Sequence, residues 1–436
     1  MLLPPPADAL PLAPTPDLLP GLQSPKIEEL ANGARVVSLD LPESPLVCID
    51  LWCRGGSLFE QAGESGMAHF LEHMVFKGSR RLEPGEFDWR IEALGGSSNA
   101  ATGFDDVHYH VLIPPEAAVE AVELLLQLVL EPRLDAEAFQ MERQVVLEEL
   151  AQSEDQPEEV ALQELLKAGC GDHPYGAAIL GRRDELQAHT TEAMAAFQRR
   201  LYRADRCVLS LCGPLSSQRE HGRAIEAAIA ASPLAALPRA ERDEQLPPLR
   251  VKSGSHRMAI PRLESARLLM LWALPPATDL DAVMGADLLT SLLAEGRRSR
   301  LVDRLREQLR LVESIDLDLH VMECGSLALL EAICDVEDLQ AVRQAIGEVL
   351  IDLAALPIPA EEWRRAERLV ANGYRFGLES CGGVAGVLGS NQLWHHQHDL
   401  AAPLRLLAGW DSARLQRQCL PLLSLERACV LEAVPA

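Results

Sequence analysis

One order of secondary-structure elements occurs twice along this chain, with a period of roughly 200 residues. Each half begins with strands, continues through a helix and further strands, and then forms two long helices. Apolar, β-branched runs predict strands at residues 34–41, 46–53, 106–113 and 207–213, and again at 266–274, 314–321 and 327–334. Helical periodicity predicts helices at 65–74, 87–94, 116–130 and 136–152, and again at 280–293, 338–356 and 361–374. The sequence therefore predicts an α+β fold of two tandem, structurally similar domains, each with a sheet packed on helices.

Proline and charge mark the limits of these two units. Residues 1–25 are rich in proline and contain no Lys or Arg, so we expect a flexible Pro-rich arm and not a signal or transit peptide. Four prolines and several charged residues predict a linker at 232–248. We therefore expect an N-terminal domain over 26–231 and a C-terminal domain over 249–436.

Composition excludes several classes of function. The 436 residues include 40 Lys and Arg against 65 Asp and Glu, and the resulting charge of −25 argues against nucleic-acid binding. No apolar run is long enough to insert into a membrane. The ten cysteines contain no CxxC pair; disulfides or a thiolate zinc site are possible, but reduced, buried thiols in a cytoplasmic protein are the favoured interpretation.

A short motif in the first half points to a metal site. His69, Glu72 and His73 stand at positions i, i+3 and i+4, so they share one face of the predicted helix at 65–74. Two imidazoles one turn apart can bind Zn²⁺, and a neighbouring carboxylate can accept a proton from water. The alternative for this pentapeptide alone is a helix that happens to carry two surface histidines.

A catalytic zinc ion needs a third protein ligand, which the helix at 136–152 can supply. Glu142 and Glu149 are seven residues apart and share one face, whereas Glu148 lies on another face and is expected to be exposed. One carboxylate of the pair could bind the metal while the other orients a histidine ring.

With these residues in view, the sequence resembles the M16 family of zinc peptidases. Four segments carry the resemblance: GESGMAHFLEHMVFKGS, LGGSSNAATGFDDVHY, ERQVVLEEL and HPYGAAILG. In the family, HxxEH is followed by a ligand Glu about 76 residues on, which falls on Glu149, with a further Glu seven residues earlier at Glu142. The resemblance implies one Zn²⁺ per chain, held by His69, His73 and Glu149. It also implies that Glu72 is the catalytic base and that Glu142 belongs to the catalytic residues.

The resemblance further implies an architecture and a mode of substrate binding. Each chain would be half of a clamshell, and two such chains would enclose a chamber that admits unfolded peptides or presequences. A peptide substrate would add as a strand to the segment at 96–101, which makes Asn99 and Ala100 the expected substrate contacts. If the chamber carries part of the negative charge, it would favour basic peptides by electrostatic steering.

The second half matches the family less closely. Arg306 matches a substrate-binding Arg of the family, although a surface salt bridge is an equally good interpretation. The Tyr expected seven residues later is replaced by Glu313. We therefore expect a zinc metalloendopeptidase that works as the zinc-bearing subunit of a homodimer or of a heterodimer with a related chain. The alternative is a non-catalytic structural or peptide-binding subunit.

Overall fold

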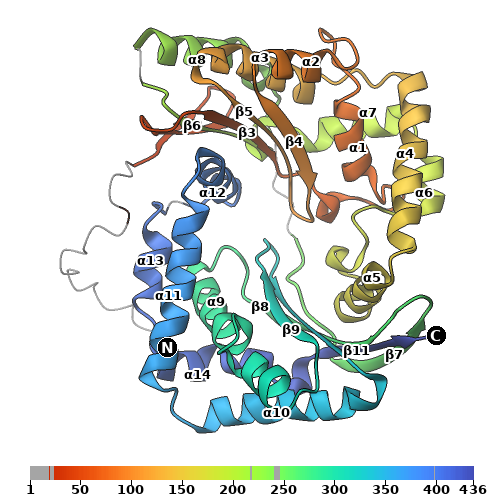
Figure 1. The fold of residues 1–436 in the computed structure, drawn as a ribbon. Coiled ribbons are helices and arrows are strands. Elements are labelled where there is room, and N and C mark those ends of the chain that lie inside the picture. The colour runs from red at the N-terminus through yellow and green to blue at the C-terminus, as the bar shows by residue number, and fades with distance from the viewer. Residues whose placement is uncertain (1–18, 20–23, 217–218, 240–245, 397) are drawn as a thin grey trace, which may run out of the picture.

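Two β-sheets, each covered by helices, form the framework of the protein (Figure 1). The computed structural model describes residues 19, 24–216, 219–239, 246–396 and 398–436. Most of the Pro-rich arm predicted at 1–25 lies outside these residues, as does part of the linker predicted at 232–248. The predicted α+β class is confirmed, because both sheets contain parallel as well as antiparallel pairs and pack on helices.

The first sheet has six strands in the spatial order β1-β2-β6-β3-β5-β4. Its strands are β1 (Lys26–Glu29), β2 (Arg35–Asp40), β3 (Val47–Cys53), β4 (Ser97–Thr102), β5 (Val107–Ile113) and β6 (Cys207–Gly213). The second sheet has five strands in the order β7-β11-β8-β10-β9. They are β7 (Gly254–Ile260), β8 (Ala266–Leu274), β9 (Ser314–His320), β10 (Ser326–Cys334) and β11 (Cys429–Pro435).

The two sheets share one topology once β1 is set aside. In each sheet the first strand of the unit pairs in parallel with the last one, as in β2 with β6 and β7 with β11. The second, fourth and third strands then follow in antiparallel pairs. The doubled order of elements in the sequence thus corresponds to two sheets of the same design, and each ends in an edge strand, β4 or β9.

Helices occupy most of the corresponding places between the strands of both halves. The first half contains α1 (Met67–Val75), α2 (Glu86–Ala93), α3 (Ala118–Leu130), α4 (Ala136–Glu154), α5 (Pro157–Cys170), α6 (Arg183–Ala188), α7 (Thr191–Leu201) and α8 (Arg219–Ala231). The second contains α9 (Leu280–Ala294), α10 (Leu339–Ala355), α11 (Ala360–Gly377), α12 (Cys381–Leu393), α13 (Ala402–Leu407) and α14 (Ser412–Gln418). None of the helices among the described residues has the length and apolar character needed to span a membrane.

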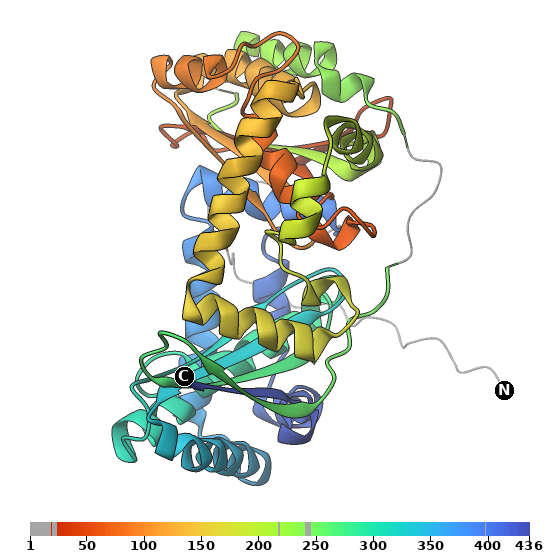
Figure 2. The ribbon, with the colours of Figure 1, turned by 90° about the vertical axis from the view of Figure 1, so that its right-hand side faces the viewer.

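The two halves exchange one helix each. Helix α5 packs against β7, β8 and β11 of the second sheet, and α12 packs against β2, β3 and β6 of the first. Figure 1 shows α12 directly beneath the first sheet, and Figure 2 shows α4 descending to α5 at the second sheet. One face of each sheet is therefore covered by a helix from the other half. A division of the chain at 232–248 stays a proposal.

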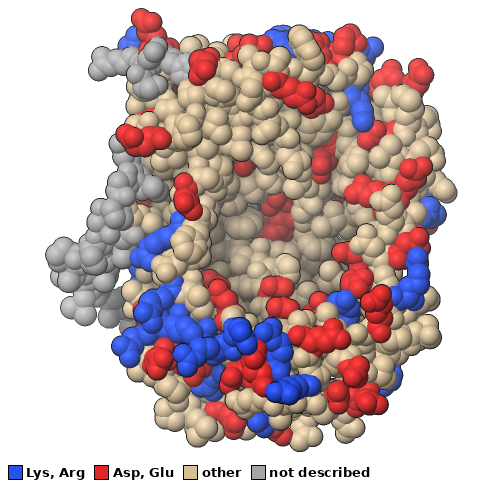
Figure 3. All heavy atoms as spheres, viewed as in Figure 1, with Lys and Arg blue, Asp and Glu red and all other residues tan. Residues whose placement is uncertain are grey.

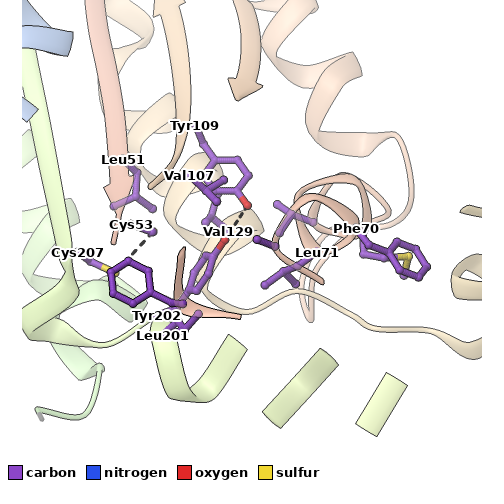
Figure 4. Close-up of a cluster of buried hydrophobic side chains, with 14 of the residues drawn as sticks. Leu51, Cys53, Phe70, Leu71, Val107, Tyr109, Val129, Leu201, Tyr202 and Cys207 are labelled. Atoms are coloured by element: carbon purple, nitrogen blue, oxygen red, sulfur yellow. Dashed lines mark hydrogen bonds between the residues drawn. The ribbon is translucent and has the colours of Figure 1, made fainter. Parts of the chain in front are cut away.

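A large apolar core lies on the face of the first sheet that packs against α1 and α3. Figure 4 shows Leu71 of α1 on the side of the buried pair Tyr109 and Tyr202, whose hydroxyl groups lie 2.9 Å apart, whereas Phe70 points away from that pair. All ten cysteines are free thiols, and only Cys324 among them is more than slightly exposed. Their burial agrees with the expectation of buried thiols.

Candidate active site

Helix α1 is fixed at its N-terminus by groups that are remote from its histidines. Gly66 precedes the helix with a φ of 79°, and a Cβ atom there would lie 2.7 Å from the carbonyl oxygen of Leu180. The carboxylate of Glu60 accepts hydrogen bonds from the backbone N–H groups of Gly66 and Ala68. Burial raises the pKa of Glu60 to about 8, and the hydrogen bonds from these two N–H groups oppose this shift. These contacts set the position of the HxxEH residues.

Helix α4 brings a carboxylate to the two histidines. Asp135 caps this helix by accepting hydrogen bonds from two backbone N–H groups, an interaction typically worth about 1 kcal/mol. Glu149 Oε2 lies 3.6 Å from His69 Nε2 and 3.4 Å from His73 Nε2. Two imidazole nitrogens and one carboxylate oxygen thus converge, which is a donor set suited to Zn²⁺ with a further position open.

Glu142 lies behind the histidines and not among the converging atoms. Its Oε1 is 2.9 Å from His73 Nδ1, and its Oε2 is 2.7 Å from Lys77 Nζ. Burial raises the pKa of Glu142, but its hydrogen bonds to His73 and Lys77 outweigh burial and hold this pKa below its usual value. The hydrogen bond to Glu142 in turn raises the pKa of His73. With Nδ1 engaged in this way, His73 directs Nε2 toward Glu149.

His69 is held in the neutral form that a metal ligand requires. Its side chain is buried, and burial together with the neighbouring His73 lowers its pKa to about 4. The rings of the two histidines meet edge to face, with centroids 4.6 Å apart. A neutral imidazole offers a free lone pair to a cation, so the electrostatics of this residue also fit a zinc ligand.

Glu72 points to the edge of the first sheet, where the hydroxyl group of Thr102 on β4 donates a hydrogen bond to its Oε2. Burial raises the pKa of Glu72 above its ordinary value, although the bond from Thr102 opposes this shift. A carboxylate with a raised pKa is a better proton acceptor. The sequence analysis missed Thr102, because its approach to Glu72 depends on the packing of α1 beside β4.

The expected substrate contacts lie on an edge strand. β4 pairs with β5 on one side only, so its other edge is available to a further strand. Asn99 is exposed, and Ala100 is half-buried against the large core. Figure 3 shows a hollow between the two halves, with acidic residues inside it and on its rim.

The residues singled out in the second half do not join this group. Arg306 lies in a π-helix at Val302–Gln308, and its guanidinium pairs with Glu307 at 3.0 Å. Glu313 donates its backbone N–H to the carbonyl oxygen of Ile333, next to β9. Glu148 is exposed, as expected. The three-ligand group is therefore built from α1 and α4 alone.

Two family models match the chain in succession. Residues 35–183 match the model described as "Insulinase (Peptidase family M16)", and residues 189–370 match the one described as "Peptidase M16 inactive domain". Together they span most of the chain. The first match contains every residue of the three-ligand group, and the second covers most of the half that lacks it.

Individual proteins agree with this assignment. An uncharacterized zinc protease of Mycobacterium leprae is 28% identical over 373 residues, which cover 84% of this chain and 81% of that protein. The mitochondrial-processing peptidase subunit beta of Dictyostelium discoideum is 29% identical over 194 residues, covering 44% of this chain and 41% of that protein. The crystal structure of a protease from Helicobacter pylori superposes with a TM-score of 0.86 at 22% identity, covering 94% of this chain and 99% of the other.

Proposed function

The chain belongs to the M16 peptidase family, and on that premise we propose that it is a zinc-dependent endopeptidase of the HxxEH type. The observation that carries the proposal is the convergence of His69 Nε2, His73 Nε2 and Glu149 Oε2 beside the carboxylate of Glu72. His69, His73 and Glu149 would hold the ion. When bound, zinc would supply the Lewis acidity that activates water and polarises a peptide carbonyl group.

The chain's own residues divide the remaining work. Glu72 accepts a proton from the attacking water and passes it to the leaving amine. Thr102 orients Glu72 through its hydrogen bond. Glu142 acts as a positioning residue, because it touches His73 and Lys77 and not the converging ligand atoms.

The substrate would bind as an added strand at β4, with Asn99 and Ala100 in contact with it. The edge strand of the second sheet carries two exposed carboxylates. Asp316 and Asp318 are exposed on β9 and alternate with buried residues. Asp316 pairs in register with Glu331, which Arg267 links to α5, so this face of the second sheet is the one that α5 covers. Such a surface supports a preference for unfolded, basic peptides or presequences.

We further propose that the working form is a dimer, either of this chain or with a related one. The second half lacks the usual Tyr, which Glu313 replaces, and the Dictyostelium relative is named as a subunit. A partner would complete the chamber and supply a donor for the reacting oxygen. Peptidase activity of the purified chain alone should be low and should rise on co-expression with the partner; full activity as a monomer would remove this part of the proposal.

The ten reduced thiols support a cytoplasmic location.

The alternative is a non-catalytic structural or peptide-binding subunit. Substitution of Glu72 by Gln separates the two, because it keeps the shape of the side chain and removes the base. We expect Glu72→Gln to retain zinc and to lose about 10²–10⁴-fold in peptide cleavage. Glu148→Gln, an exposed change on α4, is the matched control and should behave as wild type. A wild-type protein that binds zinc and peptide without cleaving it, alone or with its partner, would favour the alternative.

A further inference from the structure

A second group of metal-ligating side chains lies on the opposite face of the first sheet from α1. On β5, the buried Val107 and Tyr109 face the large core, and the alternating His108 and His110 face the other way. This second face is the one that α12 covers, through an apolar cluster with β2, β3 and β6. His108 and His110 therefore belong to a different group from His69, His73 and Glu149, and the proposed peptidase mechanism does not use them.

Register brings a carboxylate to these histidines. Asp50 on β3 stands directly opposite His110, and Trp52 stands opposite His108. The ligand atoms of Asp50, His108 and His110 all lie within 4.8 Å of one another. The ligand atoms of the three-ligand group are equally close together. Small side-chain rotations would bring three such atoms to the bond lengths of about 2.0–2.2 Å found in zinc sites.

Neighbouring elements hold this second group in place. The ring of Trp52 stacks on His108 with centroids 4.3 Å apart and an interplanar angle of 12°. Helix α12 approaches Trp52 so closely that a Cβ atom at Gly389 would lie 2.3 Å from the indole ring. His108 Nδ1 also lies 3.2 Å from Asp50 Oδ1. The rings are thus oriented by packing before any ion binds, which lowers the entropic cost of binding.

The charge around the group favours a cation. The carboxylate of Asp50 is only 3% exposed, and a buried carboxylate requires a compensating positive charge. The carboxyl groups of Asp106 and Glu72 also lie near enough to His108 to interact with its charge. The side chain of His108 keeps 24% of its surface exposed, so solutes can reach the group.

We propose that Asp50, His108 and His110 form a second site for a divalent transition-metal ion of the Zn²⁺ class. Two imidazole nitrogens and one carboxylate oxygen are a donor set for zinc, cobalt or nickel and a poor one for calcium or magnesium. The chain would then bind two such ions and not the single ion implied by its family resemblance. His110 pairs in register with Asn99 of β4, so the second ion would lie beside the edge strand proposed to bind substrate.

Metal stoichiometry tests this site without reference to peptidase activity. Titration of metal-free protein with Zn²⁺, followed by calorimetry, should give two ions per wild-type chain. His73→Ala and His110→Ala should each give one ion, and the double variant none. His320→Ala removes an exposed histidine on β9 and should leave two. One ion in the wild type, or an unchanged count in His110→Ala, would overturn the second site.

A measurement on the intact second site covers the case in which His110→Ala does not fold. His73→Ala leaves Asp50, His108 and His110 untouched, and Co²⁺ bound by it should give visible d–d absorption at one ion per chain. Absence of Co²⁺ binding by folded His73→Ala would mean that Asp50 is compensated by a proton on His108 alone, and the second site would be rejected. If the wild type then binds one ion, the proposed catalytic site stands without the second.

Discussion

The two halves of the molecule have the same strand order, yet among the described residues the groups of side chains that could hold a metal ion lie only in the first half. Helix α1 contacts α4 in the first half, and α9, which occupies the same place in the order, contacts α11 in the second. On α1 the inward positions include His69 and Phe70, whereas α9 buries apolar residues such as Leu288, Leu289 and Leu292. The same arrangement of strands and helices therefore accommodates either a polar site or an apolar core between its two helices.

The facing helices differ in the same way. Helix α4 presents Glu142 and Glu149 toward α1, whereas α11 buries Ala366 and Val370. A buried carboxylate is stable only with a partner, so Glu142 depends on His73 and Lys77. The comparison shows that the candidate site depends on a few paired polar residues on α1 and α4. The first sheet contributes the edge strand β4 beside them.

The largest effect should come from removing a ligand in the first half. His73→Ala deletes one of the three converging atoms, and loss of several kcal/mol of transition-state stabilisation corresponds to about 10³-fold or more in cleavage rate. Zinc bound at this site should disappear with the activity. His256→Ala, an exposed histidine of the second half, is the control. A comparable loss of cleavage rate in His73→Ala and His256→Ala would contradict the proposal that only the first half carries the catalytic site.

A smaller effect should follow from Glu142→Gln. The amide can still accept a hydrogen bond from His73 but no longer carries the charge that stabilises the ring, and residues in this position typically contribute 10–100-fold to metal affinity or activity. Zinc affinity and kcat should be measured together. Glu137→Gln, exposed on the same helix, should change neither. If Glu142→Gln were as inactive as Glu72→Gln, Glu142 would instead be assigned a direct contact with the reacting groups.

In the second half, the corresponding positions should matter for stability alone. Leu289→Ala on α9 removes a buried side chain and should lower the free energy of unfolding by about 2–5 kcal/mol. Zinc content measured on the folded fraction should stay at the wild-type value. The exposed Ile351 offers a control, since Ile351→Ala should change stability little. Loss of zinc from folded Leu289→Ala would mean that the halves are not independent in this respect.

A still smaller, pH-dependent effect is expected where the halves meet. Asp105 accepts hydrogen bonds from Tyr175 and from the backbone of Glu323 in the second half, and burial raises its pKa to about 6. Because this pKa is higher in the fold than in the unfolded chain, ionisation of Asp105 disfavours the fold, and its contribution to stability is lost as pH rises from about 4 through about 6.

The Asp105→Asn variant cannot ionise and should show a flatter dependence of its unfolding midpoint over this pH range. Asp316→Asn, at an exposed position on β9, should keep the wild-type slope. Equal slopes in all three proteins would show that Asp105 does not contribute to the pH dependence of stability.

The sequence predicted the parts of this molecule that depend on local pattern. Periodicity predicted most strands and the long helices, and the spacing of His69, Glu72 and His73 predicted the face of α1 on which the two histidines lie together. Resemblance to the family was needed to choose between Glu142 and Glu149, because both lie on one face of α4. In the structure, Glu149 Oε2 lies 3.6 Å from His69 Nε2 and 3.4 Å from His73 Nε2.

Features that depend on contacts between distant segments were not predictable in this way. Nothing in the local pattern of α5 or α12 indicates that each covers the sheet of the other half. The role of Thr102 and the approach of Asp50 to His110 follow from strand register, which only the assembled sheet reveals. Arg306 matches a position of the family, but it does not lie with the three-ligand group, because its π-helix belongs to the other half.

The central claim is that a zinc ion binds between α1 and α4 of the first half. Anomalous diffraction at the zinc edge, from crystals of the Glu72→Gln variant grown with Zn²⁺ and a peptide, tests it most directly. The account predicts a strong anomalous peak within bonding distance of His69, His73 and Glu149, with the peptide extended along β4. The absence of a peak at these three residues in zinc-containing crystals would contradict it.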